Sequence, residues 1–486
     1  MIKDQVDELL SSTKKGEEKA VSWDLDEITS LDQLRRWDVN AWLTPESENE
    51  DDLEAWHHHH HHHGPDHKHN HDHDHKHHHL PGHDEDGPPE GAIQPEATLL
   101  DMLRQTHHSS HFLDFLSDFP EIEKRLDDHS HNLTVFVPSN DAFDRILKGK
   151  KKEDLKLPKE DIEKLLKYHI MDGYHDYDGL KWHNTIASEM EDHELGQDEK
   201  QRLRIGLYRC PTVNLYSEIL IKDYIGKNGV IHAVDSIILP PPSISTILNL
   251  LPSHFSTTLL ALHKTGLIDQ LSAHDGSNKY TIFAPSNSAW NHIPMKITAF
   301  LFSEHGKEYL EAVMKYHIVE NRVIYSDGMI GDRQDPGGIE THFPAGYHHL
   351  TAHSLLTHKN KDEGRDESGA LNIDITRFPS MLSFRVNGHS DIMIANGVAR
   401  DGVIHIPNHI LMPPCQDLPD HGHHDESADA PHRDLKKRWS LFGWGRGEEK
   451  KVEKEVETKS CVDMSMVIED SEEGLEAWKR SWERYL

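Results

Sequence analysis

The fold is decided by NLTVFVPSNDAF at residues 132–143 and KYTIFAPSNSAW at residues 279–290, two copies of one pattern. In each copy apolar and polar residues alternate as in a β-strand and a proline ends the run. Ser-Asn then marks the start of a helix, and an aromatic residue follows one turn later. The copies lie 147 residues apart. An internal repeat of this length predicts two domains built on one plan.

Two further pairs of motifs support the repeat. LLKYHIMDG at 165–173 matches VMKYHIVEN at 313–321 with an offset of 148, and the Gly-Val-Ile-His residues that begin at Gly229 recur at Gly402 with an offset of 173. The larger offset predicts an insertion of about 25 residues in the second copy. We expect the polar stretch at 357–369 to hold it, because loops absorb insertions at little cost.

The order of the patterns predicts an α+β fold. In each copy helical apolar periodicity comes first and strands that pair come later. Sixteen histidines fall within residues 57–83 with almost no apolar side chain, so we expect a disordered linker there. The predicted division of the chain is an acidic segment at 1–56, a His-rich linker at 57–97, a first domain at 98–242, a second domain at 243–414 and a charged, Trp-containing tail at 415–486.

The three motifs resemble those of the fasciclin family, whose domains carry TVFAPTNxAF, a central Tyr-His pair and a closing G-x-I-H-x-V-D-x-V-L-L-P. Both copies carry all three in order, over about 320 residues. The resemblance implies two tandem β-wedges with packed helices, and a non-catalytic role in adhesion or contact with an unidentified protein partner. The acidic, His-rich lead and the Trp-rich tail are similar to fungal members. In the second copy Pro407 and Asn408 replace the usual Val and Asp, so we expect an edge or bulged strand there.

The Tyr-His pairs are the candidate binding residues, Tyr168 with His169 and Tyr316 with His317. They resemble the pair through which some animal fasciclin proteins are thought to engage integrins, which implies a contact with a partner. The alternative is structural: each pair finishes a helix, with the phenol ring packed and the imidazole bonded to the backbone.

The histidine tract supplies the candidate metal ligands, which are His67, His69, His71, His73, His75, His77, His78 and His79. Neutral imidazoles bind Zn(II), Cu(II) and Ni(II), and alternation lets several converge on one ion. The alternative is a low-complexity run without a metal role. We expect no required cofactor, and loosely bound Zn or Cu at this tract is the second functional hypothesis. Such binding would fade below about pH 6, because ligand histidines must be deprotonated.

Charge and motif content exclude several other functions. Lys and Arg total 52 against 85 Asp and Glu, a net charge of -33 that disfavours a nucleic-acid partner. No apolar run approaches the roughly 18 to 20 residues of a spanning helix. The basic-aromatic patch at 436–444 suggests peripheral membrane contact or docking on a domain. The sequence has no HExxH, GxSxG, Walker or dinucleotide motif, so we expect no enzyme.

Asn132 begins the single N-glycosylation sequon of the sequence, Asn132-Leu133-Thr134. It bears on the compartment, for which the indications conflict. Three cysteines, one sequon and a start without a signal-peptide pattern favour an intracellular or organellar protein, with mitochondria included. The family resemblance favours the secretory route or the vacuole.

Overall fold

The structure, a computed structural model, describes residues 93–147, 152, 157–196, 199–206, 211–272, 279–331, 341–357, 359–360, 364–365, 369–379, 381–412 and 472–482. The acidic segment, the histidine tract with its eight candidate ligands, and most of the tail lie outside these residues. The predictions made for those segments are therefore not addressed by the structure.

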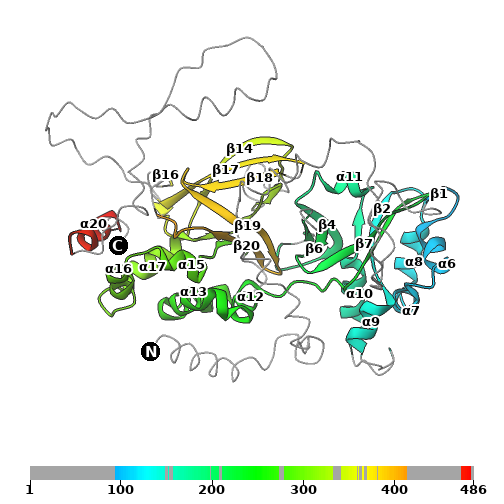
Figure 1. Ribbon diagram of the computed structural model, residues 1–486, viewed down its shortest axis with the longest axis horizontal. Helices are drawn as coiled ribbons and strands as arrows, with labels where there is room; N and C mark the ends of the chain where they lie inside the picture. Colours follow the sequence, from blue (N-terminus) through cyan, green and yellow to red (C-terminus); the bar gives the residue numbers. More distant parts are fainter. Residues whose placement is uncertain are drawn as a thin grey trace, which may run out of the picture.

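The first domain wraps one sheet around a core and packs helices against it (Figure 1). Its helices are α6 (Leu99–Gln105), α7 (Ser110–Leu116), α8 (Pro120–Asp127), α9 (Asn140–Leu147), α10 (Lys159–Tyr168) and α11 (Tyr177–Leu180). Its strands are β1 (Ile93–Gln94), β2 (Leu133–Pro138), β3 (Ile170–Asp172), β4 (Thr185–Glu191), β5 (Lys200–Gly206), β6 (Thr212–Val213), β7 (Ser217–Gly226) and β8 (Gly229–Val234). The sheet order is β1-β7-β6-β5-β4-β3-β2-β8, and β7 also pairs with β8.

The second domain repeats this plan. Its helices are α12 (Ile244–Leu250), α13 (Pro252–Thr265), α14 (Leu267–Leu271), α15 (Asn287–Asn291), α16 (Met295–Leu301) and α17 (Lys307–Tyr316). The main sheet, in the order β10-β9-β20-β19-β18-β17-β14, consists of β9 (Tyr280–Phe283), β10 (Ile318–Glu320), β14 (Gly346–His353), β17 (Ala370–Phe378), β18 (Met381–Val386), β19 (Ser390–Ala399) and β20 (Gly402–Pro407). One helix of the tail, α20 (Glu472–Trp482), packs on this domain.

The two repeated motifs meet as a pair of parallel strands in each domain. β2 pairs with β8 and places Phe136 opposite His232, while β9 pairs with β20 and places Phe283 opposite His405. The rings of both phenylalanines are completely buried. The predicted α+β fold with two tandem copies is thereby confirmed.

A glycine starts the closing strand of each copy because the neighbouring strand leaves no room for a side chain. Gly229 and Gly402 both have φ +152°. A Cβ atom would lie 2.0 Å from the carbonyl oxygen of Leu133 in the first copy and 1.8 Å from that of Tyr280 in the second. Glycine therefore permits the strand contact on which each domain is built.

The Ser-Asn dipeptide differs from its prediction as a simple helix cap. Ser286 is the N-cap of α15, since its side chain accepts a hydrogen bond from Ala289 N at 3.3 Å. Asn287 instead binds the earlier helix α13: its Oδ1 accepts from Thr257 N at 3.0 Å and its Nδ2 donates to Ser253 O at 2.9 Å. Asn140 makes the corresponding contacts near the start of α7. The asparagine therefore joins two helices and does not cap its own.

The inserted residues of the second copy occupy two places, and the prediction of a single place at 357–369 was wrong. A three-stranded sheet of β11 (Val323–Tyr325), β12 (Gly328–Ile330) and β13 (Thr341–His342) precedes β14. The pair β15 (Lys359–Asn360) and β16 (Gly364–Arg365) then follows β14. Offsets between motifs give only the sum of the two additions.

Of the two alternatives expected for the strand that contains Pro407, an edge position or a bulge, the structure shows the bulge and places the strand inside the sheet. β20 lies between β9 and β19, and Pro407 is its last residue, opposite Ile392. The missing N–H therefore falls where the pairing ends. The β19–β20 ladder is irregular, but β7–β8 of the first copy is irregular too, so the proline does not cause the bulge.

The domains are joined through a buried carboxylate. Asp327, in the turn between β11 and β12, is 0% exposed and accepts hydrogen bonds from the first domain. The donors are Asn184 N at 2.9 Å, Thr185 N at 2.6 Å and Thr185 Oγ1 at 2.6 Å. Arg202 Nε also donates to Thr185 Oγ1, at 2.8 Å, and its guanidinium lies 5.3 Å from the ring centroid of Tyr325. These contacts fix one domain against the other.

Candidate binding surfaces

Both tyrosines of the Tyr-His pairs are interior residues. Tyr168 and Tyr316 end α10 and α17 and are 0% exposed. The Tyr168 hydroxyl donates to Arg202 O at 2.9 Å and accepts from Asn214 Nδ2 at 2.8 Å. Tyr316 makes the equivalent contacts with β17 and the turn after β18. Burial raises the pKa of Tyr168 well above its ordinary value, so the phenol stays neutral.

Both histidines of the pairs are buried and neutral. His169 Nδ1 lies 2.7 Å from Leu165 O, and its Nε2 lies 3.0 Å from Ile238 N. Because a carbonyl only accepts, Nδ1 carries the proton and Nε2 accepts from the amide. His317 repeats this with Val313 O at 2.7 Å and Leu411 N at 2.9 Å. Burial lowers the pKa of each imidazole to about 4.

In this structure the Tyr-His pairs hold the end of a helix against the sheet. The exposed fraction of all four side chains is 0 to 1%, so a partner could reach them only if the core opened. The geometry is that of the structural alternative. A direct partner contact through these residues remains an untested prediction.

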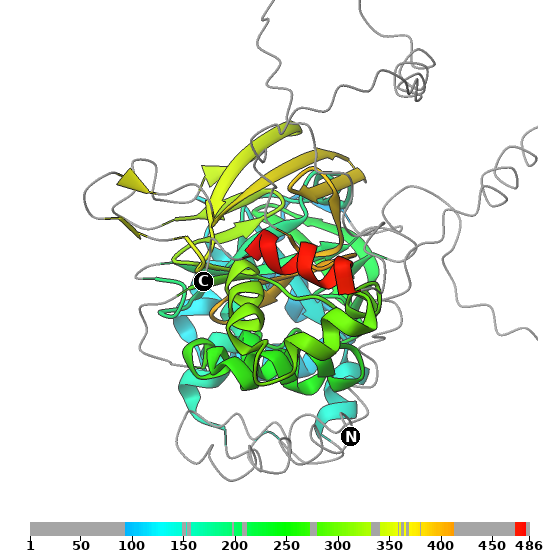
Figure 2. The same ribbon diagram turned by 90° about the vertical axis from the view of Figure 1, so that its left-hand side faces the viewer.

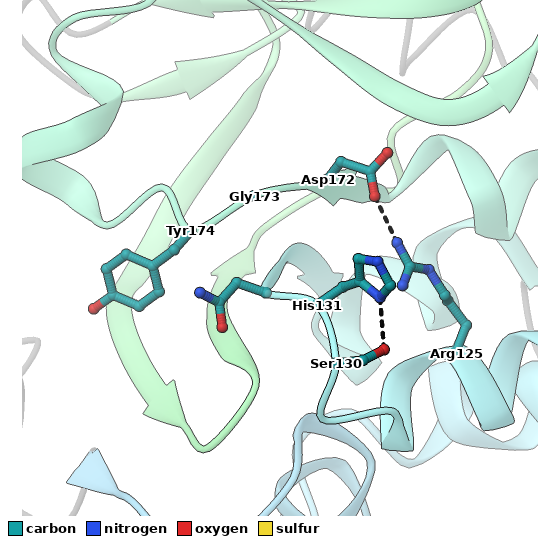
Figure 3. Close-up of a pocket in the computed structure, with 7 residues that line it drawn as sticks. Arg125, Ser130, His131, Asp172, Gly173 and Tyr174 are labelled. Carbon is teal, nitrogen blue, oxygen red and sulfur yellow. Dashed lines mark hydrogen bonds and ion pairs between the residues drawn. The ribbon is translucent and has the colours of Figure 1, made fainter.

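A surface hollow of about 560 Å³ lies beside the start of β2 (Figure 3). Its lining consists of Arg125, Ser130, His131, Asn132, Asp172, Gly173 and Tyr174. α8 contributes the arginine, the segment before β2 contributes the next three residues, and the end of β3 with its following loop contributes the rest. The hollow therefore sits where helix, strand entry and strand exit meet.

Fixed charges form one wall of the hollow. Arg125 Nη2 lies 2.6 Å from Asp172 Oδ1, and Arg125 Nε lies 2.8 Å from Glu189 Oε1. Lys200 Nζ contacts Asp172 Oδ2 at 2.6 Å. Burial alone would raise the pKa of Asp172, but Lys200 and Arg125 outweigh it and the pKa is lowered. Tyr174, 40% exposed, presents an amphipathic ring on the opposite side.

The sequon lies at the rim of the same hollow. Asn132 is exposed, whereas Leu133 and Thr134 are 0% exposed at the start of β2. Thr134 Oγ1 donates to Gly173 O at 2.9 Å, so the hydroxyl that a glycosylating enzyme reads is enclosed after folding. A glycan at Asn132 would have to be added before this strand is buried. Its presence remains a prediction.

Within the described residues, no group of three or more His, Cys, Asp or Glu side chains is arranged to hold a metal ion. The rings of His175 and His183 approach to 4.8 Å between centroids, but His175 Nε2 contacts Asp172 O at 3.1 Å. Metal binding by the histidine tract stays a prediction. Metal uptake by the full chain before and after deletion of residues 57–83 would test it.

None of the helices in the described parts of the chain is both long and apolar enough to cross a membrane. The basic-aromatic patch at 436–444 lies outside those parts, so a peripheral contact through it is not addressed.

Comparison with known proteins agrees with the paired motifs. The sequence profile of the fasciclin domain matches residues 107–240 and 253–413, more than half of the chain. The chain belongs to the fasciclin family. Each matched region contains all three motifs, including the buried Phe and the Tyr-His pair. The resemblance stated from the sequence is confirmed.

Relatives of this fasciclin protein include a fungal protein and animal proteins. The chain is 25% identical over 343 residues to aurofusarin biosynthesis cluster protein S of Gibberella zeae, a match that covers 66% of this chain and 78% of that protein. Mouse stabilin-2 is 26% identical over 38% of this chain, and pig transforming growth factor-beta-induced protein ig-h3 is 25% identical over 47%. These two matches span only 7% and 28% of the relatives' own lengths.

A solved FAS1 domain pair of the insect cell adhesion molecule Fasciclin I covers 62% of this chain and 96% of its own, with 14% identity and a TM-score of 0.29. From the family match and the curated relatives, fasciclin domains are found in adhesion proteins, and the family is generally non-catalytic.

Sequence reasoning missed both the hollow and the joint between domains. Arg125 and Asp172 lie 47 residues apart and share no motif. Asp327 and Thr185 are 142 residues apart, and Asp327 lies in the part of the second copy without a counterpart in the first. The sequence offered one signal near the hollow, the sequon that begins at Asn132 at the entry to the strand motif, and this signal did not indicate a hollow.

Proposed function

We propose that this fasciclin protein is a non-catalytic binding protein of the adhesion type, which holds two domains as one rigid body and contacts a protein partner through the hollow at Arg125 and Tyr174. The observation that carries the proposal is the contrast between the motifs and the hollow. The motif residues are buried in the core, while the hollow offers the exposed Tyr174 and Asp172 beside the half-buried Arg125. Exposed Tyr and Arg are the side chains that most often anchor protein interfaces.

The relatives support the general class of function. Stabilin-2, the ig-h3 protein and periostin carry fasciclin sequence and belong with adhesion proteins. The hollow lies in the first domain, so the proposed contact involves residues 125–174, and the second domain fixes its orientation through Asp327.

The test begins with capture of partners on the immobilised full chain, identification of the captured protein, and measurement of its affinity with purified components. Tyr174→Ala should weaken binding by tenfold or more. Tyr347→Ala is the matched control, because Tyr347 is 64% exposed in the second domain, far from the hollow in sequence. If both variants and the unaltered chain bind the partner with equal affinity, the hollow is not part of the contact.

A further inference from the structure

The tail helix α20 covers the outer face of α16 and α17 in the second domain, where Figure 2 shows it in red across the green helices. Trp478 and Trp482 lie one turn apart on α20 and are 1% and 0% exposed. The Trp478 ring centroid lies 6.1 Å from that of Tyr309, and the Trp482 centroid lies 6.0 Å from that of Tyr316. Both indole rings are thus inserted among aromatic side chains of α17.

Charged groups also take part in the contact, and they define the orientation of α20 on this face. Lys479 Nζ lies 4.6 Å from the ring centroid of Phe300 on α16, a cation–π arrangement. Lys296 Nζ, also on α16, lies 3.8 Å from Glu472 Oε1 in the first turn of α20. The face therefore recognises a helix that carries an acidic residue first, then two aromatic residues with a basic residue between them.

Between the described residues, the contacts of α20 with this face are made by side chains. The helix is not hydrogen-bonded into any sheet of the described residues. In the sequence, residues 413–471 separate it from the end of the second domain. With eleven residues it is too short to be a stable helix by itself in water. Its release would therefore leave the sheets of the second domain paired as they are.

The first domain lacks the features that α20 uses. α10 ends on Tyr168 as α17 ends on Tyr316, but seven residues earlier α10 has Asp161 where α17 has Tyr309. An indole ring would meet a carboxylate there, where the second domain offers an aromatic ring. The site is thus a property of the second copy and not of the shared scaffold.

We propose that the face of α16 and α17 is a binding site for an amphipathic helix of a partner protein, with two aromatic side chains one turn apart and a basic residue between them, and that α20 fills this site in cis. Helices bind grooves in this way through anchors at positions i and i+4. Release of α20 is then the step that makes the surface available. The inference rests on the proposed binding function and adds to it a second contact and a way to control it.

The test uses the full chain and a labelled synthetic peptide of residues 470–486 as the probe. Trp478→Ala combined with Trp482→Ala removes both anchors of α20, so the peptide should bind this variant with one saturable site. The unaltered chain should bind the peptide at least tenfold more weakly, because α20 competes. Arg480→Ala, on the exposed side of α20, is the control and should behave as the unaltered chain. A peptide with both tryptophans replaced should not bind.

Two results would overturn the proposal: no peptide binding by a double variant whose circular dichroism matches the unaltered chain, or equal binding by both. Hydrogen exchange on the unaltered chain gives a second test that needs no variant. Amides of 472–482 should exchange at least 100-fold faster than those of α17, and equal rates would mean that α20 is part of the domain core.

The same materials separate this proposal from the general binding function. A partner captured by the unaltered chain should bind the double variant more tightly and be displaced from it by the peptide. A partner that binds both chains equally and ignores the peptide would leave the binding function standing and remove the helix site.

Discussion

Phe283, Ser286 and Asn287 of the repeated motif contribute to the stability of the fold in different ways and by different amounts. Phe283→Ala should cost about 3 to 5 kcal/mol, because a completely buried ring is lost and a cavity remains. Asn287→Ala should cost about 1 to 3 kcal/mol, since its bonds to Ser253 and Thr257 are lost. Ser286→Ala removes one cap bond and should cost about 1 kcal/mol. Denaturant unfolding with a constant slope measures this order, and a near-neutral Phe283→Ala would contradict it.

His317 predicts a pH dependence of stability. Its pKa is about 4 in the folded chain and 6.5 in the unfolded one, so the unfolded chain takes up the proton first as the pH falls. The stability contribution is complete above pH 6.5 and is lost toward pH 4. Between pH 7.5 and pH 5 the loss is about 2 kcal/mol for this one residue. In His317→Gln, the drop in unfolding free energy over this range should therefore be smaller by about that amount.

Two features keep this test specific. Burial raises the pKa of Asp401 to about 7, and its contribution has the opposite sign because it is lost as the pH rises. Both chains share Asp401, so it cancels in the difference. The comparison also uses the drop between the two pH values and not the stabilities themselves, so any pH-independent cost of the substitution is removed. An unchanged pH dependence in His317→Gln would show that His317 titrates normally.

Much of the residue-level picture could be predicted from sequence. Alternation in the strand motifs identifies Phe136 and Phe283 as core residues, and both are buried. The role of Asn287 could not be predicted, because its partners lie about thirty residues earlier on α13 and no periodicity links them. The sequence did not decide between a structural and a binding role for the Tyr-His pairs, because the same two residues can finish a packed helix or form an exposed contact.

Among the elements, the strand pairs β2–β8 and β9–β20 depend on their first glycine. Gly402→Ala should cost about 3 kcal/mol or more, because the new Cβ would overlap Tyr280 O and the backbone would remain at positive φ. Gly266→Ala is the matched control: its φ is +77°, but nothing lies within 4 Å of the added Cβ. It should cost only about 1 kcal/mol. Equal thermal shifts for the two variants would show that strain, and not the overlap, sets the cost.

Element positions followed from sequence where a motif repeats, and less well elsewhere. β2 and β9 fall within the quoted motifs. The two additions around β14 could not be separated, because a difference in length does not show where residues are added. The position of β20 inside the sheet depends on β19, which no motif identifies.

For the whole molecule, Asp327 is one of several contacts that join the two domains and favour their unfolding together. Asp327→Ala leaves Asn184 N, Thr185 N and Thr185 Oγ1 without their acceptor in a buried site, at a cost of about 3 to 5 kcal/mol. Calorimetry should show one transition for the unaltered chain and two for the variant. Asp391→Ala, which removes an exposed ion pair with Arg385, should keep the single transition. Two transitions in the unaltered chain would mean that the joint does not couple the domains.

The relation between the domains was beyond prediction from the sequence. An internal repeat indicates that two domains exist, but the joint between them is made by residues that are not part of the repeated motifs. Thr185 and Arg202 lie in strands of ordinary composition, and Asp327 lies in an added turn. The role of these three residues in joining the domains becomes visible only when strands from both copies are placed side by side, as in Figure 1.

The two-residue strand β1 determines where a fragment that contains the first domain should begin. Ile93 and Gln94 pair in parallel with Ile225 and Gly226 at the rim of β7. An uncovered strand rim is a template on which other chains add and aggregate. A fragment that starts at Thr98, the boundary suggested by sequence, would lack this cover and should self-associate in light scattering. A fragment that starts a few residues before Ile93 should remain monodisperse, so the usable end of the first domain lies upstream of its first helix.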